Sequence, residues 1–283
     1  MNFYKKLLES DSKPQIMGIL NVTPDSFYDG GMYNNEKDSI IKAEKMIKEG
    51  VDIIDVGACS TRPGAKEISI NEEEKRLFPI LEKIKDQFPN IKVSIDTYRH
   101  QIAKKAIQCG ADIINDIYFE KETNKMINVI LENNTPYILM HMQGAPSNMQ
   151  NNIQYYNFKE EIISFFRNNT TLLNKRGVKN IILDPGFGFG KTLNQNYELI
   201  NMIPTLKKLG YPLLTGTSHK SMIKKALNIN NDHTLCGTIT LNTLCLSKGA
   251  NIIRVHDVLE AKQTINLFNL MKKNNTPNIN EEN

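Results

Sequence analysis

The sequence predicts a single α/β domain built as a (β/α)8 TIM barrel, with the active site at the C-terminal rim of its strands. Three observations predict it: eight short apolar runs recur along the chain, amphipathic stretches separate them, and the pattern fills residues 14–273. A barrel of this kind needs eight strands that are each followed by a helix. A doubly wound open sheet is the main alternative, although it usually has fewer strands.

The apolar runs are short, rich in β-branched residues and nearly continuous in apolar character. Parallel strands that are covered on both faces have this pattern. The runs are QIMGIL (15–20), VDIIDVG (51–57), IKVSID (91–96), ADIIND (111–116), YILMH (137–141), NIILDPG (180–186), PLLTGT (212–217) and NIIRVH (251–256).

Helical patterns lie between these runs, and several stop at a glycine or before a proline, which are common helix stops. Helices are predicted over 37–50, 72–88, 100–110, 161–177 and 258–273. No linker rich in Pro, Gly or Ser interrupts the pattern, so 14–273 is expected to be one domain. Residues 1–13 form an N-terminal extension, and the polar tail 274–283 is expected to be disordered.

Composition excludes several classes of protein. With 40% hydrophobic and 23% charged residues the chain is not disordered, and a net charge of +4 spread along the chain argues against nucleic acid as a partner. No apolar stretch approaches the ~18 residues of a membrane helix. The four cysteines lack zinc-ligand spacing, and the first residues do not resemble a secretory signal, so we expect a cytoplasmic protein.

All eight runs carry polar side chains at or just after their C-terminal ends. These residues are Asn21, Asp55, Asp96, Asn115 and Asp116, His141, Asp184, Ser218 and Lys220, and Arg254, His256 and Asp257. Because the strand ends of a barrel share one rim, where active sites are built, we expect these side chains to meet there. Solvent exposure alone would favour Lys and Glu over short amides and carboxylates.

One set of these side chains consists of short hydrogen-bond acceptors. Asp96, Asn115 and Asp184 stand on stiff strands, and a carboxylate can pair with an amino-pyrimidine edge as it does with a guanidinium group. This set suits a flat heterocycle that presents N–H donors along one edge.

The other set is cationic and suits a phosphorylated group. It comprises Arg62, Lys220, Arg254 and His256, and the helix that follows the eighth run adds N–H groups at its N-terminus. Mg2+ is commonly held by one or two protein oxygens together with substrate phosphates, and Asn21 is a candidate for such a ligand.

Two other features of the sequence bear on function. The stretch GFGFGKT (186–192) has three residues between Gly186 and Gly190 where a P-loop needs four, so it is not a P-loop. Two long loops, 21–34 and 57–67, are expected to be lids that exclude water from the rim.

Taken together, these residues resemble the dihydropteroate synthase family of pterin-binding barrels. The matching stretches, which follow the family order, are MGILNVTPDSF-DGG (17–31), IIDVGACSTRPGA (53–65), SIDT (94–97), NDI (115–117), DPGFGFGKT (184–192), GTSHKSMI (216–223) and RVHDV (254–258).

The resemblance implies a reaction and a homodimer. Enzymes of this family join 6-hydroxymethyl-7,8-dihydropterin diphosphate to 4-aminobenzoate, which gives 7,8-dihydropteroate and diphosphate in folate biosynthesis. Mg2+ is the cofactor that the resemblance implies, and the expected partners are these small molecules, not nucleic acid or a membrane. Sulfonamides compete at the aminobenzoate site of the family.

The resemblance also implies a role for each matching residue. The pterin would be held by Asp96, Asn115, Ile117, Met140, Asp184 and Lys220. The aminobenzoate site would comprise Phe27, Thr61, Pro63, Phe189 and Ser218. The diphosphate would be bound by Asn21, Arg62, Arg254 and His256, with Asn21 as the Mg2+ ligand. Asp96, Lys220, Arg62, Arg254 and His256 would carry the chemistry.

Some residues depart from the family pattern, and alternative functions stay open at this point. His219 stands where Arg is common, and Thr217 and Tyr28 also replace commoner residues. The alternatives are a non-catalytic pterin-binding paralogue, a Schiff-base aldolase that uses Lys220, and methyl transfer from a methylated folate. The last would leave the cationic set and the two long loops without a role.

Overall fold

A computed structural model describes residues 3–9, 12–22, 32–59, 67–145, 149–150 and 153–274. Its strands are β1 (Gln15–Asn21), β2 (Ile53–Gly57), β3 (Lys92–Asp96), β4 (Ile113–Asp116), β5 (Tyr137–Met140), β6 (Ile181–Asp184), β7 (Leu214–Thr215) and β8 (Ile252–Val255). Its α-helices are α1 (Phe3–Leu8), α2 (Met32–Glu49), α3 (Ile70–Gln87), α4 (His100–Gln108), α5 (Phe119–Asn133), α6 (Phe158–Lys175), α7 (Leu193–Lys207), α8 (Ser221–Leu227), α9 (Leu235–Ser247) and α10 (Val258–Asn274), with a 3-10 turn at Asn231–His233.

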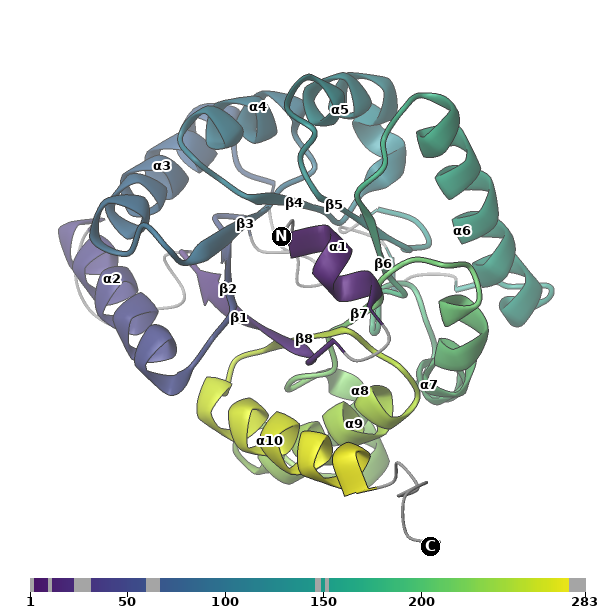
Figure 1. Ribbon diagram of the computed structural model, residues 1–283. Coiled ribbons are helices and arrows are strands. Elements are labelled where there is room, and N and C mark those ends of the chain that lie inside the picture. Colours follow the sequence, from purple (N-terminus) through teal and green to yellow (C-terminus); the bar gives the residue numbers. More distant parts are fainter. Residues whose placement is uncertain are drawn as a thin grey trace, which may run out of the picture.

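The eight strands close into a barrel that is surrounded by helices (Figure 1). They are parallel and hydrogen-bonded in the order β6-β5-β4-β3-β2-β1-β8-β7. A parallel bridge between Leu183 and Leu213 then joins β6 to the segment before β7. An open doubly wound sheet would leave two free edges, so that alternative is excluded and the predicted (β/α)8 barrel is confirmed.

Each predicted strand is present, although most are shorter than their apolar runs. The largest difference is β7, which has two residues where the run spans 212–217. Pro212 has no N–H to donate to a ladder, and the pairing with β8 covers only Leu214 and Thr215. Thr217 lies beyond the ladder, and its hydroxyl donates to Oδ1 of Asn242 in α9 at 3.0 Å.

The five helices predicted individually are confirmed, and their ends follow local signals. Ser69 caps α3 by accepting a hydrogen bond from the Glu72 N–H at 3.2 Å, and Thr192 forms a capping box with Gln195 at the start of α7. Gly50, with φ of 91°, ends α2 in the left-handed conformation that glycine adopts without strain. The sequence did not single out α5, α7, α8 and α9; in α9 no charged residue marks an outer face.

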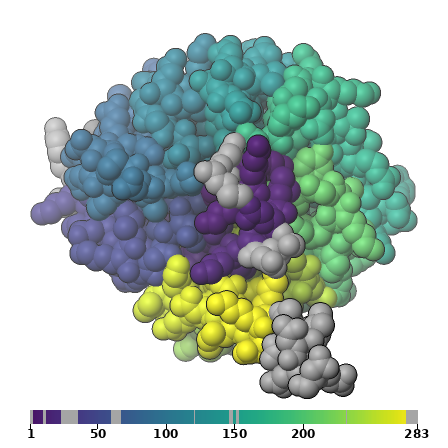
Figure 2. All heavy atoms as spheres, viewed as in Figure 1, coloured from purple at the N-terminus to yellow at the C-terminus, as the bar shows by residue number. Residues whose placement is uncertain are grey.

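Helix α1 lies across the N-terminal end of the barrel, inside the ring of strands in Figure 1, and its side chains cover that end in Figure 2. Tyr4 and Leu7 are buried against residues at the strand starts, among them Met17 and Ile182. The Tyr4 hydroxyl donates to the carbonyl oxygen of Ile181 at 3.0 Å. The N-terminal extension therefore plugs the end of the barrel opposite the active-site rim. The tail predicted to be disordered lies, beyond Asn274, outside the described residues.

Strand register brings the polar strand ends to one height at the opposite rim. Asp96 of β3 is paired in register with Asn115 of β4, and Met140 of β5 with Asp184 of β6. These neighbours on adjacent strands are the acceptors and the apolar residue that the sequence assigned to one binding site.

Candidate active site

The described part of the chain places most of the predicted site residues at the C-terminal rim. Those present there are Asn21, Asp96, Asn115, Ile117, Met140, Asp184, Phe189, Ser218, Lys220, Arg254 and His256. Four others, Phe27, Thr61, Arg62 and Pro63, lie outside the described residues. The two loops predicted to be lids also fall largely outside them.

The centre of the site is a buried network of two carboxylates, one guanidinium group and one amide. Arg254 Nε donates to Asp55 Oδ2 at 2.6 Å, and Arg254 Nη2 donates to Asp96 Oδ2 at 3.0 Å. Asn115 Nδ2 donates to the same Asp55 oxygen at 3.2 Å. The network joins strands β2, β3, β4 and β8, and it exists only because closure of the barrel brings Arg254 next to Asp55.

Two buried acceptor atoms of this network, Asp55 Oδ1 and Asn115 Oδ1, have no hydrogen-bond partner among the described residues. Buried polar atoms normally find a partner in the native state. The Asn115 oxygen therefore marks where a bound molecule can donate a hydrogen bond, and the Asp55 oxygen marks where a water can.

This environment shifts the pKa of the Asp96 carboxyl group. Its pKa is raised to about 7: burial is the largest cause, Arg254 acts against it, and the negative charge of Asp55 adds to the rise. Its carboxylate form is therefore favoured by any bound group that carries or develops positive charge.

Asp184 ends β6 and begins a turn that needs glycine. Its Oδ1 accepts a hydrogen bond from the Gly186 N–H at 2.8 Å. A Cβ on Gly186 would lie 2.0 Å from the carbonyl oxygen of His141, and φ there is 70°, so only glycine fits. Burial raises the pKa of Asp184. The turn holds one carboxylate oxygen and leaves the other for a ligand.

An apolar wall stands beside these acceptors. Ile117 and Met140 are buried in one cluster, and the ring of Phe189 packs against it. Lys220 Nζ lies 4.3 Å from the centroid of the same ring, a cation–π geometry. Burial, followed by the positive charge of Arg254, lowers the pKa of Lys220 to about 8.

Lys191, the lysine of the GFGFGKT stretch, is buried and donates hydrogen bonds to backbone carbonyl groups of the rim. Its Nζ donates to the carbonyl oxygens of Gly186 and Phe189, both at 2.9 Å, and of His141 at 3.2 Å. It also lies 3.0 Å from Nδ1 of His141, whose ring packs edge-on to Phe165. His141, predicted from its place at a strand end, thus contributes to this support instead of lining the site centre.

The rim segments that follow β7 and β8 contact each other. The Ser218 hydroxyl lies 3.0 Å from Nδ1 of His256 and accepts a hydrogen bond from the His256 N–H at 3.2 Å. His219, the departure from the family pattern, has φ of 52°, and its ring lies between Thr234 Oγ1 at 2.5 Å and Asp257 Oδ2 at 2.7 Å. Its side chain bridges rim segments.

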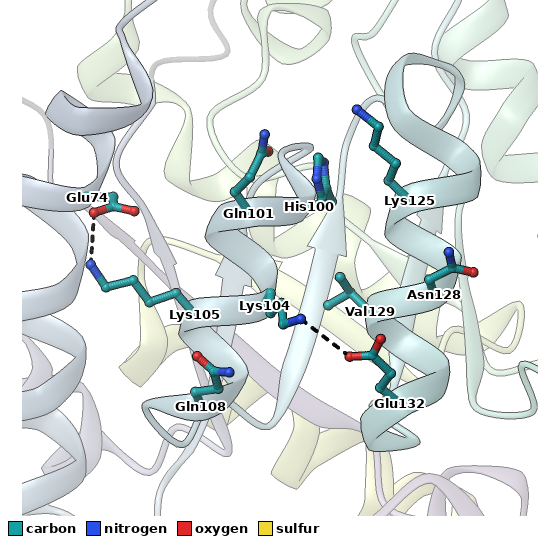
Figure 3. A pocket seen from close by; sticks show the side chains of 10 residues that line it. All are labelled: Glu74, His100, Gln101, Lys104, Lys105, Gln108, Lys125, Asn128, Val129 and Glu132. Carbon is teal, nitrogen blue, oxygen red and sulfur yellow. Dashed lines mark hydrogen bonds and ion pairs between the residues drawn. The ribbon is translucent and has the colours of Figure 1, made fainter.

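The remaining surface offers a groove on the outside of the barrel, between α4 and α5 (Figure 3). Lys105 pairs with Glu74 at 2.8 Å and Lys104 with Glu132 at 3.8 Å, so much of its charge is already neutralised. Within the described ranges, no helix has the length and apolar content to span a membrane.

Comparisons with known proteins give one consistent result. A family model described as pterin binding enzyme matches residues 17–256. A dihydropteroate synthase from Clostridium beijerinckii is 42% identical over 274 residues, which cover 96% of this chain and 99% of the relative. One from Escherichia coli K12 is 41% identical over 256 residues, 90% of each chain.

Solved structures agree in fold along nearly the whole chain. A dihydropteroate synthase from Yersinia pestis, solved with a sulfonamide drug complex, has a TM-score of 0.87 and 37% identity and covers 94% of this chain and 96% of its own. One from Clostridium difficile, solved in the presence of pteroic acid, has a TM-score of 0.86 and 39% identity, with 92% and 97% coverage. One from Xanthomonas albilineans with 4-aminobenzoic acid has a TM-score of 0.86 and 30% identity, with 93% and 94% coverage.

Proposed function

The chain belongs to the dihydropteroate synthase family of pterin-binding enzymes, which makes it a transferase, and we propose that it joins 6-hydroxymethyl-7,8-dihydropterin diphosphate to 4-aminobenzoate. The products are 7,8-dihydropteroate and diphosphate. The observation that carries the proposal is the meeting of Asp96, Asn115 and Asp184 with Arg254 at one rim of the barrel. Pteroic acid and 4-aminobenzoic acid in the solved relatives support these substrates.

The pterin ring is held by side chains that accept hydrogen bonds. Asp184 and Asn115 take the N–H donors of the heterocycle, and burial strengthens each hydrogen bond because water does not compete for it. Lys220 supplies a donor from the side of Phe189, and Ile117 and Met140 line the apolar wall.

The diphosphate is proposed to bind Arg254, at the end of β8, and Arg62 of the second long loop, which is the second cation by sequence. His256 follows β8, but its place in the predicted cationic set is wrong, because burial and then the positive charge of Arg254 lower its pKa to about 3. It can therefore contribute a hydrogen bond to the diphosphate but no positive charge. The amide oxygen of Asn21, half-buried at the end of β1, is a hard donor that fits Mg2+ as a single protein ligand. When bound, Mg2+ would neutralise charge on the departing diphosphate.

The reaction exchanges one bond for another at the pterin methylene carbon. The C–O bond to diphosphate breaks and its electron pair leaves with the diphosphate, while the amine lone pair of 4-aminobenzoate forms the new C–N bond. The Asp96 carboxylate faces the positive charge that develops on the pterin, and Arg254 faces the negative charge on the leaving group. The amine nitrogen then releases one proton.

The aminobenzoate is proposed to bind beside Phe189 and Ser218, together with Phe27, Thr61 and Pro63. Ser218 offers a hydroxyl that already contacts His256. This places the acceptor substrate next to the diphosphate, so that the amine can approach the methylene carbon.

A homodimer is proposed on the face formed by α9 and α10. Helix α9 has no charged residue, and Leu244 on it is 43% exposed. On α10, Leu267 and Leu270 are 69% and 57% exposed. Exposed leucines on two helices that pack against each other support a protein interface at this face. Sedimentation should give a dimer that Leu244→Arg converts to a monomer, whereas Leu131→Arg on α5 should not.

A cytoplasmic location is proposed from the cysteine chemistry. Cys59, Cys109, Cys236 and Cys245 are free thiols, which suits a reducing compartment.

The function is tested by measuring diphosphate release from the pterin diphosphate, with and without 4-aminobenzoate and Mg2+. Release that needs both, with dihydropteroate formed in equal amount, is expected. Tight pterin binding without turnover would favour a non-catalytic paralogue. Trapping of a substrate carbonyl on Lys220 by borohydride would favour the aldolase.

A further inference from the structure

Asp55 is a fully buried charged group at the rim, and the proposed mechanism gives it no contact with substrate. Its side chain has 0% exposure, and one of its oxygens accepts two hydrogen bonds, from Arg254 Nε and from Asn115 Nδ2. A buried carboxylate is costly unless it is paired, and here the guanidinium group of Arg254 pairs it.

The chemistry of a carboxylate decides which way the Asn115 amide faces. An amide has a donor end and an acceptor end, whereas a carboxylate can only accept. Asp55 therefore requires the Nδ2 end of Asn115, and the Oδ1 end must face the other way. Across the described residues, that Oδ1 has no protein partner although it is buried.

We propose that Asp55 is a specificity-determining positioning residue, which fixes the Asn115 amide so that its oxygen faces the N–H donors of the heterocycle. This inference rests on the proposed pterin function. With the amide fixed, the site accepts a ring edge that donates at this position and rejects one that accepts there. Asp55 also holds Arg254 through Nε, so the same residue positions a group on the diphosphate side.

The test uses 6-hydroxymethylpterin, which lacks the diphosphate, so that Arg254 contributes little to binding. Calorimetry on the full chain compares wild type, Asp55→Asn, Asn115→Ala and the double variant. Each single change is expected to weaken binding about tenfold or more, the size of one lost hydrogen bond to a charged or buried group. The double variant should bind about as weakly as Asn115→Ala alone, because Asp55 acts through that amide.

Losses that multiply in the double variant would overturn the inference, because independent contributions add in free energy. Unchanged binding in Asp55→Asn would also overturn it. Asp116→Asn is the matched control. The sequence placed Asp116 among the rim side chains, but both of its oxygens are engaged away from this network, one by the Tyr137 hydroxyl at 2.6 Å and one by the Tyr118 N–H at 2.9 Å, so the change should leave pterin affinity unchanged.

A second measurement does not depend on whether Asp55→Asn folds. In wild-type protein, NMR should show the Asn115 side-chain NH2 protons protected from exchange with water, unlike those of exposed Asn128. Equal exchange would contradict the hydrogen bond to Asp55. Turnover of the pterin diphosphate is measured in parallel. If the affinity losses of the two variants are coupled but no dihydropteroate forms, this inference stands and the proposed function is contradicted. If dihydropteroate forms but the affinity losses multiply, the proposed function stands and this inference is contradicted.

Discussion

Nζ of Lys191 lies 3.0 Å from Nδ1 of His141, in a buried position where it also donates to three backbone carbonyl oxygens. Two of these carbonyls belong to Gly186 and Phe189, on the turn that shapes the pterin site. The lysine therefore replaces backbone donors that the irregular turn lacks, and it keeps Phe189 where Lys220 can lie over its ring.

Lys191→Met should destabilise the fold by about 1–3 kcal/mol, because buried carbonyls lose their donor. Burial lowers the pKa of Lys191 to about 7, so the unfolded chain binds more protons than the folded one between that pH and the ordinary lysine value. This lysine's contribution to stability therefore rises with pH over that range. Denaturant unfolding should show that Lys191→Met loses more free energy of unfolding at pH 9 than at pH 7. The control Lys45→Met, at an exposed site, should show neither the loss nor its dependence on pH.

Turnover should rise with pH through about 7, because the Asp96 carboxylate is the form that faces the developing cation. Burial raises this pKa, Arg254 lowers it and Asp55 raises it, so Asp55→Asn should move the midpoint of the rise to lower pH. The pH profile of kcat/KM measures this. Asp86→Asn, at an exposed position on α3, is the control, and an unmoved midpoint in Asp55→Asn would contradict the assignment.

Pterin binding should weaken as pH rises through about 8, where Lys220 loses its proton. Burial and the charge of Arg254 place its pKa there. Lys220→Met should lower kcat/KM by roughly 10–100-fold, the size of one charged hydrogen bond. In Lys220→Arg the alkaline loss should disappear, since guanidinium stays protonated. An alkaline loss that persists in Lys220→Arg would assign the titration to another group.

The sequence predicts the barrel and the rim well, because both follow from one-dimensional patterns. Apolar runs mark the strands, and polar residues at their ends mark the rim, so Asp96 and Asp184 can be identified without coordinates. The hydrogen-bond partners of Asp55 cannot be identified in this way. Arg254 lies 199 positions away along the chain, and only closure of the barrel and the strand register make them neighbours.

The supporting residues are hidden for a related reason. Lys191 belongs to a stretch that resembles a P-loop without matching it, and its partners are backbone carbonyls, which leave no pattern in side-chain types. The contacts of His219 with Thr234 and Asp257 likewise depend on a left-handed residue and on segments that are distant in sequence.

Asp184→Ala should weaken binding of 6-hydroxymethylpterin by roughly 10–100-fold, because the N–H donors of the heterocycle lose a buried acceptor worth ~1–3 kcal/mol. The Gly186 N–H loses its partner as well, so thermal unfolding is measured alongside. Asp184→Asn keeps an acceptor oxygen and should lose less affinity than Asp184→Ala. Calorimetry that finds wild-type affinity in Asp184→Ala would remove this residue from the pterin site.

Arg254→Gln should weaken the pterin diphosphate far more than 6-hydroxymethylpterin, because the guanidinium group is the cation that faces the leaving group. Gln keeps donors for Asp55 and Asp96, which limits the cost of leaving those carboxylates unpaired. If Arg254 binds the diphosphate, the affinity for the pterin diphosphate, divided by the affinity for 6-hydroxymethylpterin, falls by about tenfold or more in the variant. This is the size of a charged hydrogen bond. Equal losses for both ligands, measured by calorimetry, would mean that Arg254 acts only by organising the carboxylates.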